Sequence, residues 1–215
     1  MKTRIFNLII IDESGSMQSI KKPTIDSVNE TIQSVRAAQK QYEDQEHFVS
    51  LVSFNDNVKV INECAPVAEI QELNDETYLP NCCTALYDAI GISVNALRKR
   101  VEKDDKVLVT IVTDGYENAS REWSGKAIKE LIEEMRQKGW VFTYIGANHD
   151  VEATAATISI TNTMIFEASN EGVDEMVKKE CYSRNLWYKK VHDGMADAEE
   201  DNRSFFGKVS DLFKK

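Results

Sequence analysis

The stretch Ile5-Phe6-Asn7-Leu8-Ile9-Ile10-Ile11, followed directly by Asp12-Glu13-Ser14-Gly15-Ser16, decides the fold of this chain. A run this rich in aliphatic and β-branched residues predicts a strand that is buried on both faces of a sheet. In open α/β sheets, ligands bind beyond the carboxyl ends of such strands. At that end, Asp12, Ser14 and Ser16 offer three hard oxygen atoms to a cation such as Mg²⁺.

A second apolar run, Val107-Leu108-Val109-Thr110-Ile111-Val112-Thr113, also ends in a carboxylate, Asp114, which Gly115 follows. Thr84 lies between the two runs, in a turn-like stretch (79–88) that opens a helix. With right-handed crossovers, the ends of these two strands, the first and fourth along the chain, would lie side by side. We therefore predict that Asp12 and Asp114 meet across one cleft, with the hydroxyl of Thr84 on a loop beside them.

Each of these segments also has a simpler structural explanation. Asp12 to Ser16 could form a turn in which the aspartate and the serines bind backbone N–H groups. Thr84 could be an ordinary helix N-cap, and Asp114-Gly115 could be a simple turn. The five side chains in this order, all expected near strand ends, favour metal binding over these explanations.

The combined pattern of D-x-S-x-S, a loop threonine and T-D-G resembles the von Willebrand factor type A (vWA) domain and its metal-ion-dependent adhesion site. The resemblance covers roughly the first 170 residues. It implies five metal ligands, at Asp12, Ser14, Ser16, Thr84 and Asp114, that hold Mg²⁺, or Mn²⁺ or Ca²⁺ in its place.

The resemblance also implies a function. A partner protein would offer an Asp or Glu carboxylate to the metal, so the chain would be a protein-binding module and not an enzyme. Bacterial proteins similar to this one, with a lone vWA domain, act as adaptors in multi-protein systems. We expect the rim of the site to select the partner, with contributions from Glu13, Gln18, Tyr116, Glu117 and Asn118.

The alternative function is a Mg²⁺-dependent, phosphatase-like hydrolase that uses Asp12. Haloacid dehalogenase-like phosphatases use D-x-D after the first strand, with the second carboxylate as general acid. Here that position is Ser14, which cannot act as an acid at neutral pH. The G-x-G-x-x-G turn of a dinucleotide-binding enzyme is missing too. In Asn148-His149-Asp150, we expect Asp150 to cap a helix beside a solvent-exposed histidine.

The order of predicted elements supports a Rossmann-like α/β fold. Apolar residues at helical spacing predict helices over 24–42 and 86–101 and a third helix that Gly139 ends. The apolar face of the third helix comprises Ile128, Leu131, Ile132 and Met135. Asn55-Asp56-Asn57 predicts a hairpin between strands 48–54 and 58–61. Strands are also expected at 140–146 and 164–166, with a short helix between them. The result is a doubly wound, mostly parallel sheet of six strands with one antiparallel edge strand and helices on both faces.

Composition narrows the class of partner and the expected location. Of 215 residues, 36 are acidic and 26 are basic, so the formal charge of −10 argues against binding nucleic acid. The first apolar run is too short for a membrane span and has no cleavage site, so it predicts neither a signal peptide nor a span. We expect a cytoplasmic location with reduced thiols, because no metal or disulfide spacing links Cys64, Cys82, Cys83 and Cys181.

The C-terminal region is expected to divide into three parts. A helix over 173–192 packs back onto the vWA-like domain, which would span residues 1–192. Residues 193–203 are polar and acidic, which predicts a flexible linker. Over 204–215 a short amphipathic helix is predicted, which either docks into a partner protein or folds back onto this domain. Its apolar stripe comprises Phe205, Phe206, Val209, Leu212 and Phe213.

Overall fold

A single six-stranded sheet forms the centre of the computed structural model, which describes residues 2–207. Its strand order is β3-β2-β1-β4-β5-β6. Five strands are parallel, and β3 runs antiparallel to β2 at one edge, as predicted. The strands are β1 (Thr3–Asp12), β2 (Gln45–Phe54), β3 (Val58–Pro66), β4 (Lys106–Thr113), β5 (Val141–Gly146) and β6 (Asn162–Ile165).

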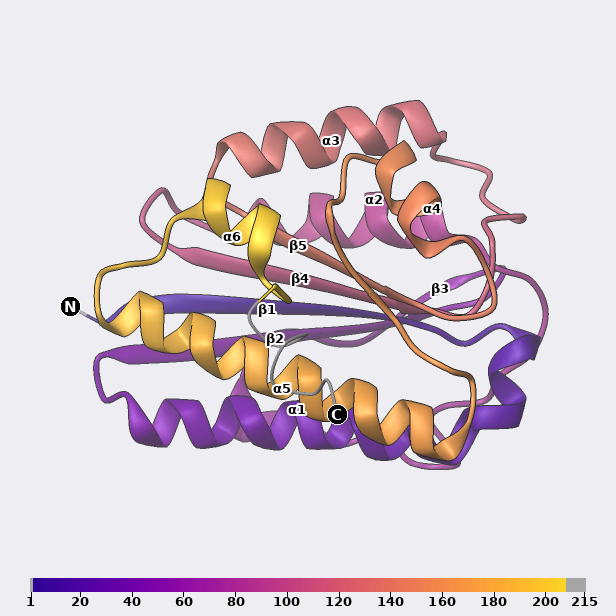
Figure 1. Cartoon of the computed structure of the whole chain (residues 1–215), viewed down its shortest axis with the longest axis horizontal. Helices are drawn as coiled ribbons and strands as arrows, with labels where there is room; N and C mark the ends of the chain where they lie inside the picture. Colours follow the sequence, from indigo (N-terminus) through magenta and orange to yellow (C-terminus); the bar gives the residue numbers. More distant parts are fainter. Residues whose placement is uncertain (1, 208–215) are drawn as a thin grey trace.

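Helices cover both faces of this sheet (Figure 1). On one face lie α1 (Lys21–Gln41) and α5 (Asn170–His192), and on the other lie α2 (Leu86–Leu97), α3 (Gly125–Gln137) and α4 (Val151–Thr157). Alternate residues of β1 pack into separate cores on the two faces, Phe6 and Leu8 with α2 and α3, and Ile5 and Ile9 with α1 and α5. The first apolar run is thus buried on both sides, which explains its composition.

Two short 3₁₀ helices follow strand ends, η1 (Gly15–Ile20) and η2 (Val67–Glu69). The first is important because it turns the D-E-S-G-S loop from β1 into α1, directly at the carboxyl end of the sheet. Met17 and Ile20 of η1 are buried in a small core with Ile145, so this loop is anchored by packing as well as by its backbone.

The structure corrects the expected flexible linker over 193–203, because residues Ala198–Ser204 form a helix, α6. Asp197 caps this helix by accepting a hydrogen bond from Glu200 N–H at 2.9 Å. Asp201 accepts hydrogen bonds from Trp187 Nε1 and Lys190 Nζ, and Asn202 accepts one from Phe142 N–H. Asp201 and Asn202 are therefore buried and hold α6 against the rest of the domain.

The C-terminal stripe is described only in its first two residues. Phe205 is buried in the core with α1 and α5, and Phe206 packs beside it. Val209, Leu212 and Phe213 lie outside the described residues, so the expected helix over 204–215 stays a prediction. Among residues 2–207, no helix combines the length and apolar character needed to cross a membrane.

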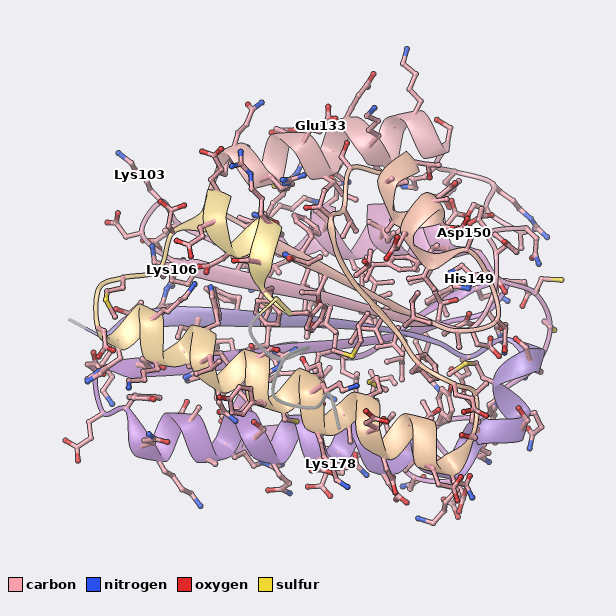
Figure 2. The ribbon with its side chains drawn as sticks, viewed as in Figure 1. Lys103, Lys106, Glu133, His149, Asp150 and Lys178 are labelled. Carbon is pink, nitrogen blue, oxygen red and sulfur yellow. The ribbon has the colours of Figure 1, made fainter. Side chains whose placement is uncertain are left out.

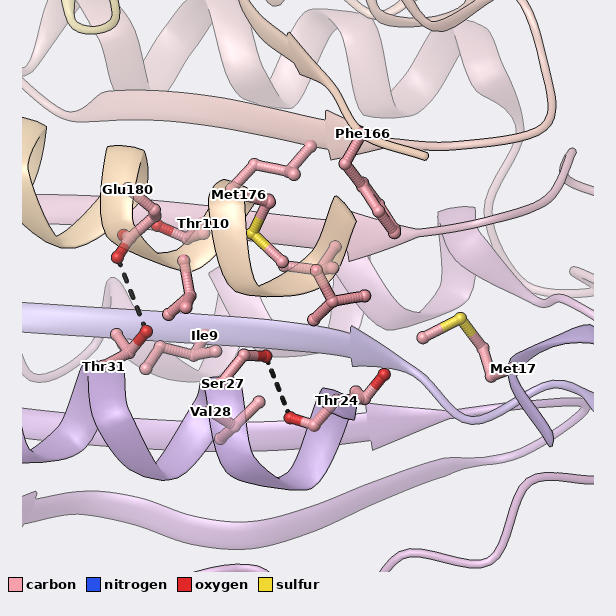
Figure 3. A pocket seen from close by; sticks show the side chains of 14 residues that line it. Ile9, Met17, Thr24, Ser27, Val28, Thr31, Thr110, Phe166, Met176 and Glu180 are labelled. Carbon is pink, nitrogen blue, oxygen red and sulfur yellow. Dashed lines mark hydrogen bonds between the residues drawn. The ribbon is translucent and has the colours of Figure 1, made fainter. Parts of the chain in front are cut away.

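A buried ion pair fixes α5 to the middle of the sheet. Arg184 is fully buried and pairs with Glu180 one turn earlier. Its guanidinium also donates to Asn7 Oδ1 of β1 at 2.9 Å and to Thr110 Oγ1 of β4 at 2.8 Å. Next to this pair, a cavity lies between α1, α5 and the sheet, where Thr31 donates to Glu180 (Figure 3).

Candidate metal centre

Asp12 ends β1 and is completely buried. One carboxylate oxygen, Oδ1, accepts a hydrogen bond from Ser14 N–H at 2.7 Å. The other, Oδ2, accepts one from Thr113 Oγ1 at 2.5 Å, across the boundary between β1 and β4. The two strand ends therefore meet as predicted, and each oxygen of Asp12 keeps a lone pair that is free of these hydrogen bonds.

Ser16 links the first loop to the second carboxylate. Its hydroxyl donates to Asp114 Oδ1 at 2.5 Å and lies 3.2 Å from Ser14 Oγ. Asp114 is buried, and its other oxygen, Oδ2, has no hydrogen-bond partner among the described residues. A buried carboxylate oxygen without a donor is unfavourable, so this atom has the environment expected for a cation ligand.

Thr84 lies on the loop before α2, close to Gly115 and so to Asp114. Its N–H donates to Asn118 Oδ1 at 2.9 Å, and its carbonyl accepts from Asn118 N–H at 3.0 Å. Its hydroxyl oxygen lies 3.6 Å from the position that a Cβ on Gly115 would occupy. The N-cap of α2 is Ala85, without a side-chain hydrogen bond, so the N-cap explanation of Thr84 is wrong.

Burial makes the negative charges of Asp12 and Asp114 unfavourable. The pKa of Asp12 is raised to about 6: burial is the main cause, the nearby charge of Asp114 adds to it, and the hydrogen bonds from Thr113 and Ser14 oppose it. Burial also raises the pKa of Asp114, although the hydroxyl of Ser16 opposes this effect. A divalent cation would remove much of the repulsion.

The types of donor limit which ions fit. Among residues 2–207, no group of three or more His, Cys, Asp and Glu side chains is arranged to hold a metal. A cation bound here would therefore depend on hydroxyl oxygens in addition to the two carboxylates. Hydroxyls and carboxylates are ligands for hard ions such as Mg²⁺, Mn²⁺ and Ca²⁺.

Part of the expected rim has a structural role that sequence analysis missed. The carboxylate of Glu117 accepts hydrogen bonds from the N–H groups of Tyr87, Ala119 and Ser120. Asp88 accepts three more from the N–H groups of residues 121–123. These two carboxylates hold the loop after Asp114 against the start of α2.

The first loop shows the same behaviour. Glu13 is buried, and its carboxylate accepts a hydrogen bond from Leu79 N–H. Asn81 N–H donates to the Glu13 carbonyl at 2.9 Å, and Gly15 N–H donates to the Cys82 carbonyl at 3.2 Å. The loop that carries Ser14 and Ser16 is thus fastened to the loop that carries Thr84. Glu13 and Glu117 fix these loops, whereas Gln18 and Tyr116 remain exposed.

A histidine and a second cap lie at the same end of the sheet. Asp150 accepts from Ala153 N–H at 3.0 Å and caps α4, as predicted. His149 is partly buried, because its ring contacts those of Tyr116 and Tyr144. The expectation of a solvent-exposed histidine is therefore wrong, since two aromatic rings enclose it.

Comparisons with known proteins agree with this architecture. The sequence matches the von Willebrand factor type A domain family over residues 8–179. A search of curated proteins found no match. Among solved structures, the chain is similar to the PilB minor pilin from Streptococcus sanguinis, at 12% identity and a TM-score of 0.57, over 86% of this chain and 62% of that one.

Two further solved structures extend the comparison. The vWF domain of the type V pili tip protein Mfa5 from Porphyromonas gingivalis has a TM-score of 0.57 at 10% identity, over 84% of this chain and 96% of that one. Proximal thread matrix protein 1 from the mussel byssus, with a zinc-occupied MIDAS motif, has a TM-score of 0.53 at 13% identity, over 84% of this chain. The present chain spans 46% of that protein and 62% of PilB, and these likenesses concern the fold.

Proposed function

The chain belongs to the von Willebrand factor type A domain family, and from this premise we propose that it is a metal-dependent protein-binding module. The metal ligands in this proposal are Asp12, Ser14, Ser16, Thr84 and Asp114. The cation is Mg²⁺, with Mn²⁺ or Ca²⁺ as substitutes, and it supplies an electropositive centre that accepts a carboxylate from a partner protein.

The observation that carries the proposal is the unpartnered oxygen of Asp114. Asp114 Oδ2 is buried without a donor, while its neighbour Oδ1 accepts from Ser16. A turn that used these residues only as backbone caps would leave this oxygen unexplained. A cation close to Oδ2 would satisfy it and would also lower the pKa of Asp12.

The charge balance of the ligand set supports a carboxylate as the partner group. Two carboxylates neutralise a divalent cation, and the three hydroxyls are weak, neutral ligands. A third carboxylate, from outside, would therefore meet a centre that still attracts oxygen ligands. Since the chain carries a net charge of −10, its overall field would repel an acidic group, so the attraction must come from the cation.

The alternative, a Mg²⁺-dependent hydrolase, receives less support from the site. A nucleophilic Asp12 would have to present an oxygen to the phosphorus atom of a substrate, but this side chain is completely buried. Ser14 remains in the place where such enzymes carry an acid. The absence of enzymatic activity is accordingly part of the proposal.

A titration of Mg²⁺ and Mn²⁺ by calorimetry tests the metal site. Wild type should bind one cation, and Asp12→Ala and Asp114→Ala should lose binding while remaining folded. Asp26→Ala is the matched control, because Asp26 is an aspartate on the exposed surface of α1, where it pairs with Lys22. Equal metal binding in wild type and Asp12→Ala would contradict the proposal.

A turnover assay on the same proteins tests the hydrolase alternative. We expect no hydrolysis of a generic aryl phosphate with either metal. Metal-dependent turnover that disappears in Asp12→Ala would replace the binding module with a hydrolase.

A bacterial adaptor in the cytoplasm remains the proposed setting. All four cysteines are free, which agrees with a reducing compartment. Two of the similar structures are described as a minor pilin and a pili tip protein, so cell fractionation of the producing organism is the appropriate test.

A further inference from the structure

Beside the loop that carries Ser14 and Ser16, four further segments lie at this end of the sheet and are joined by hydrogen bonds; we call them the site rim: residues 54–57, 78–85, 115–120 and 147–150. Asn55 binds Asn81 through its side chain at 2.8 Å, and its carbonyl accepts from Ala85 N–H at 2.7 Å. Tyr116 joins the last two segments, because its hydroxyl accepts a hydrogen bond from Asp150 N–H at 3.1 Å. A partner carboxylate that reached the proposed metal would lie beside these segments.

Two large apolar side chains project from the site rim. Tyr116 is 55% exposed and Leu79 is 50% exposed. Tyr116 is also held in place, because its ring lies 5.2 Å from that of His149 and its hydroxyl binds Asp150. A fixed, exposed aromatic ring loses little conformational freedom on binding, which suits it to contact an apolar partner residue.

The charges of the site rim are acidic. Its four segments contain no Lys or Arg, but they contain Asp56, Glu117 and Asp150. Asp56 directly follows Asn55, whose side chain donates to Asn81 in the loop that carries Thr84, so Asp56 lies next to that loop. Asp150 is exposed at this end of the sheet, whereas Lys103 and Lys106 lie at the opposite end (Figure 2).

These charges act differently on different parts of a partner. The proposed cation attracts one carboxylate, but every further acidic residue beside that carboxylate would meet Asp56, Asp150 and a chain of charge −10. Basic residues beside it would instead be attracted. Opposite charges exposed at a rim contribute modestly, about a two- to fivefold gain in affinity per pair.

Resting on the proposed function, we propose that the site takes a protein segment in which a single Asp or Glu stands between basic and apolar residues. The carboxylate reaches the cation, the basic residues lie near Asp56 and Asp150, and an apolar residue packs on Tyr116 or Leu79. Segments with runs of acidic residues are rejected, because only one of their charges can be compensated.

Selection from a display library of random nonapeptides with a fixed central Glu tests this inference. The full chain is immobilised with Mg²⁺, and bound peptides are eluted with EDTA. We expect the eluted peptides to contain Lys or Arg at least twice as often as Asp or Glu beside the central residue, together with enriched apolar residues. Acidic or unbiased flanks in metal-dependent binders would overturn the inference and leave the proposed function intact.

Two controls separate the inference from the function on which it rests. If wild type yields no more EDTA-eluted peptide than Asp12→Ala does, the proposed function itself fails. Asp56→Lys should shift the preferred flanks toward acidic residues, and an unchanged preference would overturn the charge argument. Tyr116→Ser should reduce the enrichment of apolar residues, with calorimetry and circular dichroism used to confirm that this variant binds Mg²⁺ and is folded.

Discussion

Replacing Asp12 by asparagine should stabilise the metal-free protein while removing its response to Mg²⁺. The side chain is completely buried, and its pKa is about 6 instead of the ordinary 3.8. At about 1.4 kcal/mol per pKa unit, this difference means that an ionised Asp12 destabilises the fold by about 3 kcal/mol at neutral pH. Asparagine has nearly the same shape and carries no charge.

The hydrogen bonds around this position can survive the change. Ser14 N–H would still donate to an amide oxygen. The hydroxyl of Thr113, which now donates to Asp12 Oδ2, has a second acceptor in the Gly115 carbonyl at 3.3 Å. It can therefore turn toward that carbonyl and accept a hydrogen bond from the new amide group.

The sign of the pH dependence follows from the raised pKa. The neutral carboxyl group is tolerated below pH 3.8, and its contribution to stability is lost as the pH rises through about 6. Asp12→Asn should therefore exceed wild type by about 3 kcal/mol at pH 7.5 and by only about 1 kcal/mol at pH 4.5. Urea unfolding in EDTA at these two pH values measures both differences.

Added Mg²⁺ should reverse the order of stability. Binding to the folded state alone stabilises wild type by RT ln(1 + [Mg²⁺]/Kd), whereas the asparagine variant loses a charged ligand and gains less. If metal-free Asp12→Asn is less stable than wild type at pH 7.5, the carboxylate is not electrostatically disfavoured. Asp12 would then serve the loop as a cap, and the reasoning would be refuted.

Three further perturbations have defined outcomes. Ser16→Ala should weaken Mg²⁺ binding about tenfold in calorimetry, because it removes one neutral ligand, whereas Ser19→Ala, on the exposed side of the same loop, should not. Arg184→Ala should lower the free energy of unfolding by about 3–5 kcal/mol, because it leaves Glu180 buried without its partner. Replacing both Arg184 and Glu180 by apolar residues should lower it less, which would identify the unpaired charge as the cause. Burial lowers the pKa of His47 from 6.5 to about 4. As the pH falls from 6.5 to 4, the free energy of unfolding should therefore decrease by up to about 3 kcal/mol, and that of His47→Gln should decrease less.

The sequence predicted the framework of the fold because that framework depends on local patterns. The unbroken apolar run before Asp12 indicated a strand with two buried faces, and Asn55-Asp56-Asn57 indicated the hairpin that makes β3 antiparallel. The meeting of Asp12 and Asp114 followed from the handedness of crossovers. Residues Ile11 and Val112, just before the two strand ends, are indeed paired in the sheet.

The contacts that hold the site together could not be predicted in this way. Glu117 resembles any surface carboxylate in the sequence, and its role arises from Tyr87 N–H, 30 residues away. Arg184 reads as a solvent-facing helix residue, yet it is buried because Asn7 and Thr110 offer acceptors in the middle of the sheet. Such roles depend on which loops and strands the fold brings together, and single-sequence periodicity carries no information about that.

The linker prediction for the segment that contains α6 was wrong for a related reason. Acidic composition predicts solvation, but in the folded chain Asp201 accepts hydrogen bonds from Lys190 and Trp187, and Asn202 accepts one from the backbone of β5. A charged residue with a tertiary partner and one without a partner look identical in the sequence.

The central claim is that a cation binds between the ends of β1 and β4. The most direct measurement is an anomalous difference map from crystals of the chain grown with Mn²⁺. The account predicts one strong peak that lies within about 2.5 Å of the hydroxyl oxygens of Ser14 and Ser16 and close to Asp114. A peak elsewhere on the surface, or none at this cleft at full Mn²⁺ occupancy in solution, would contradict it.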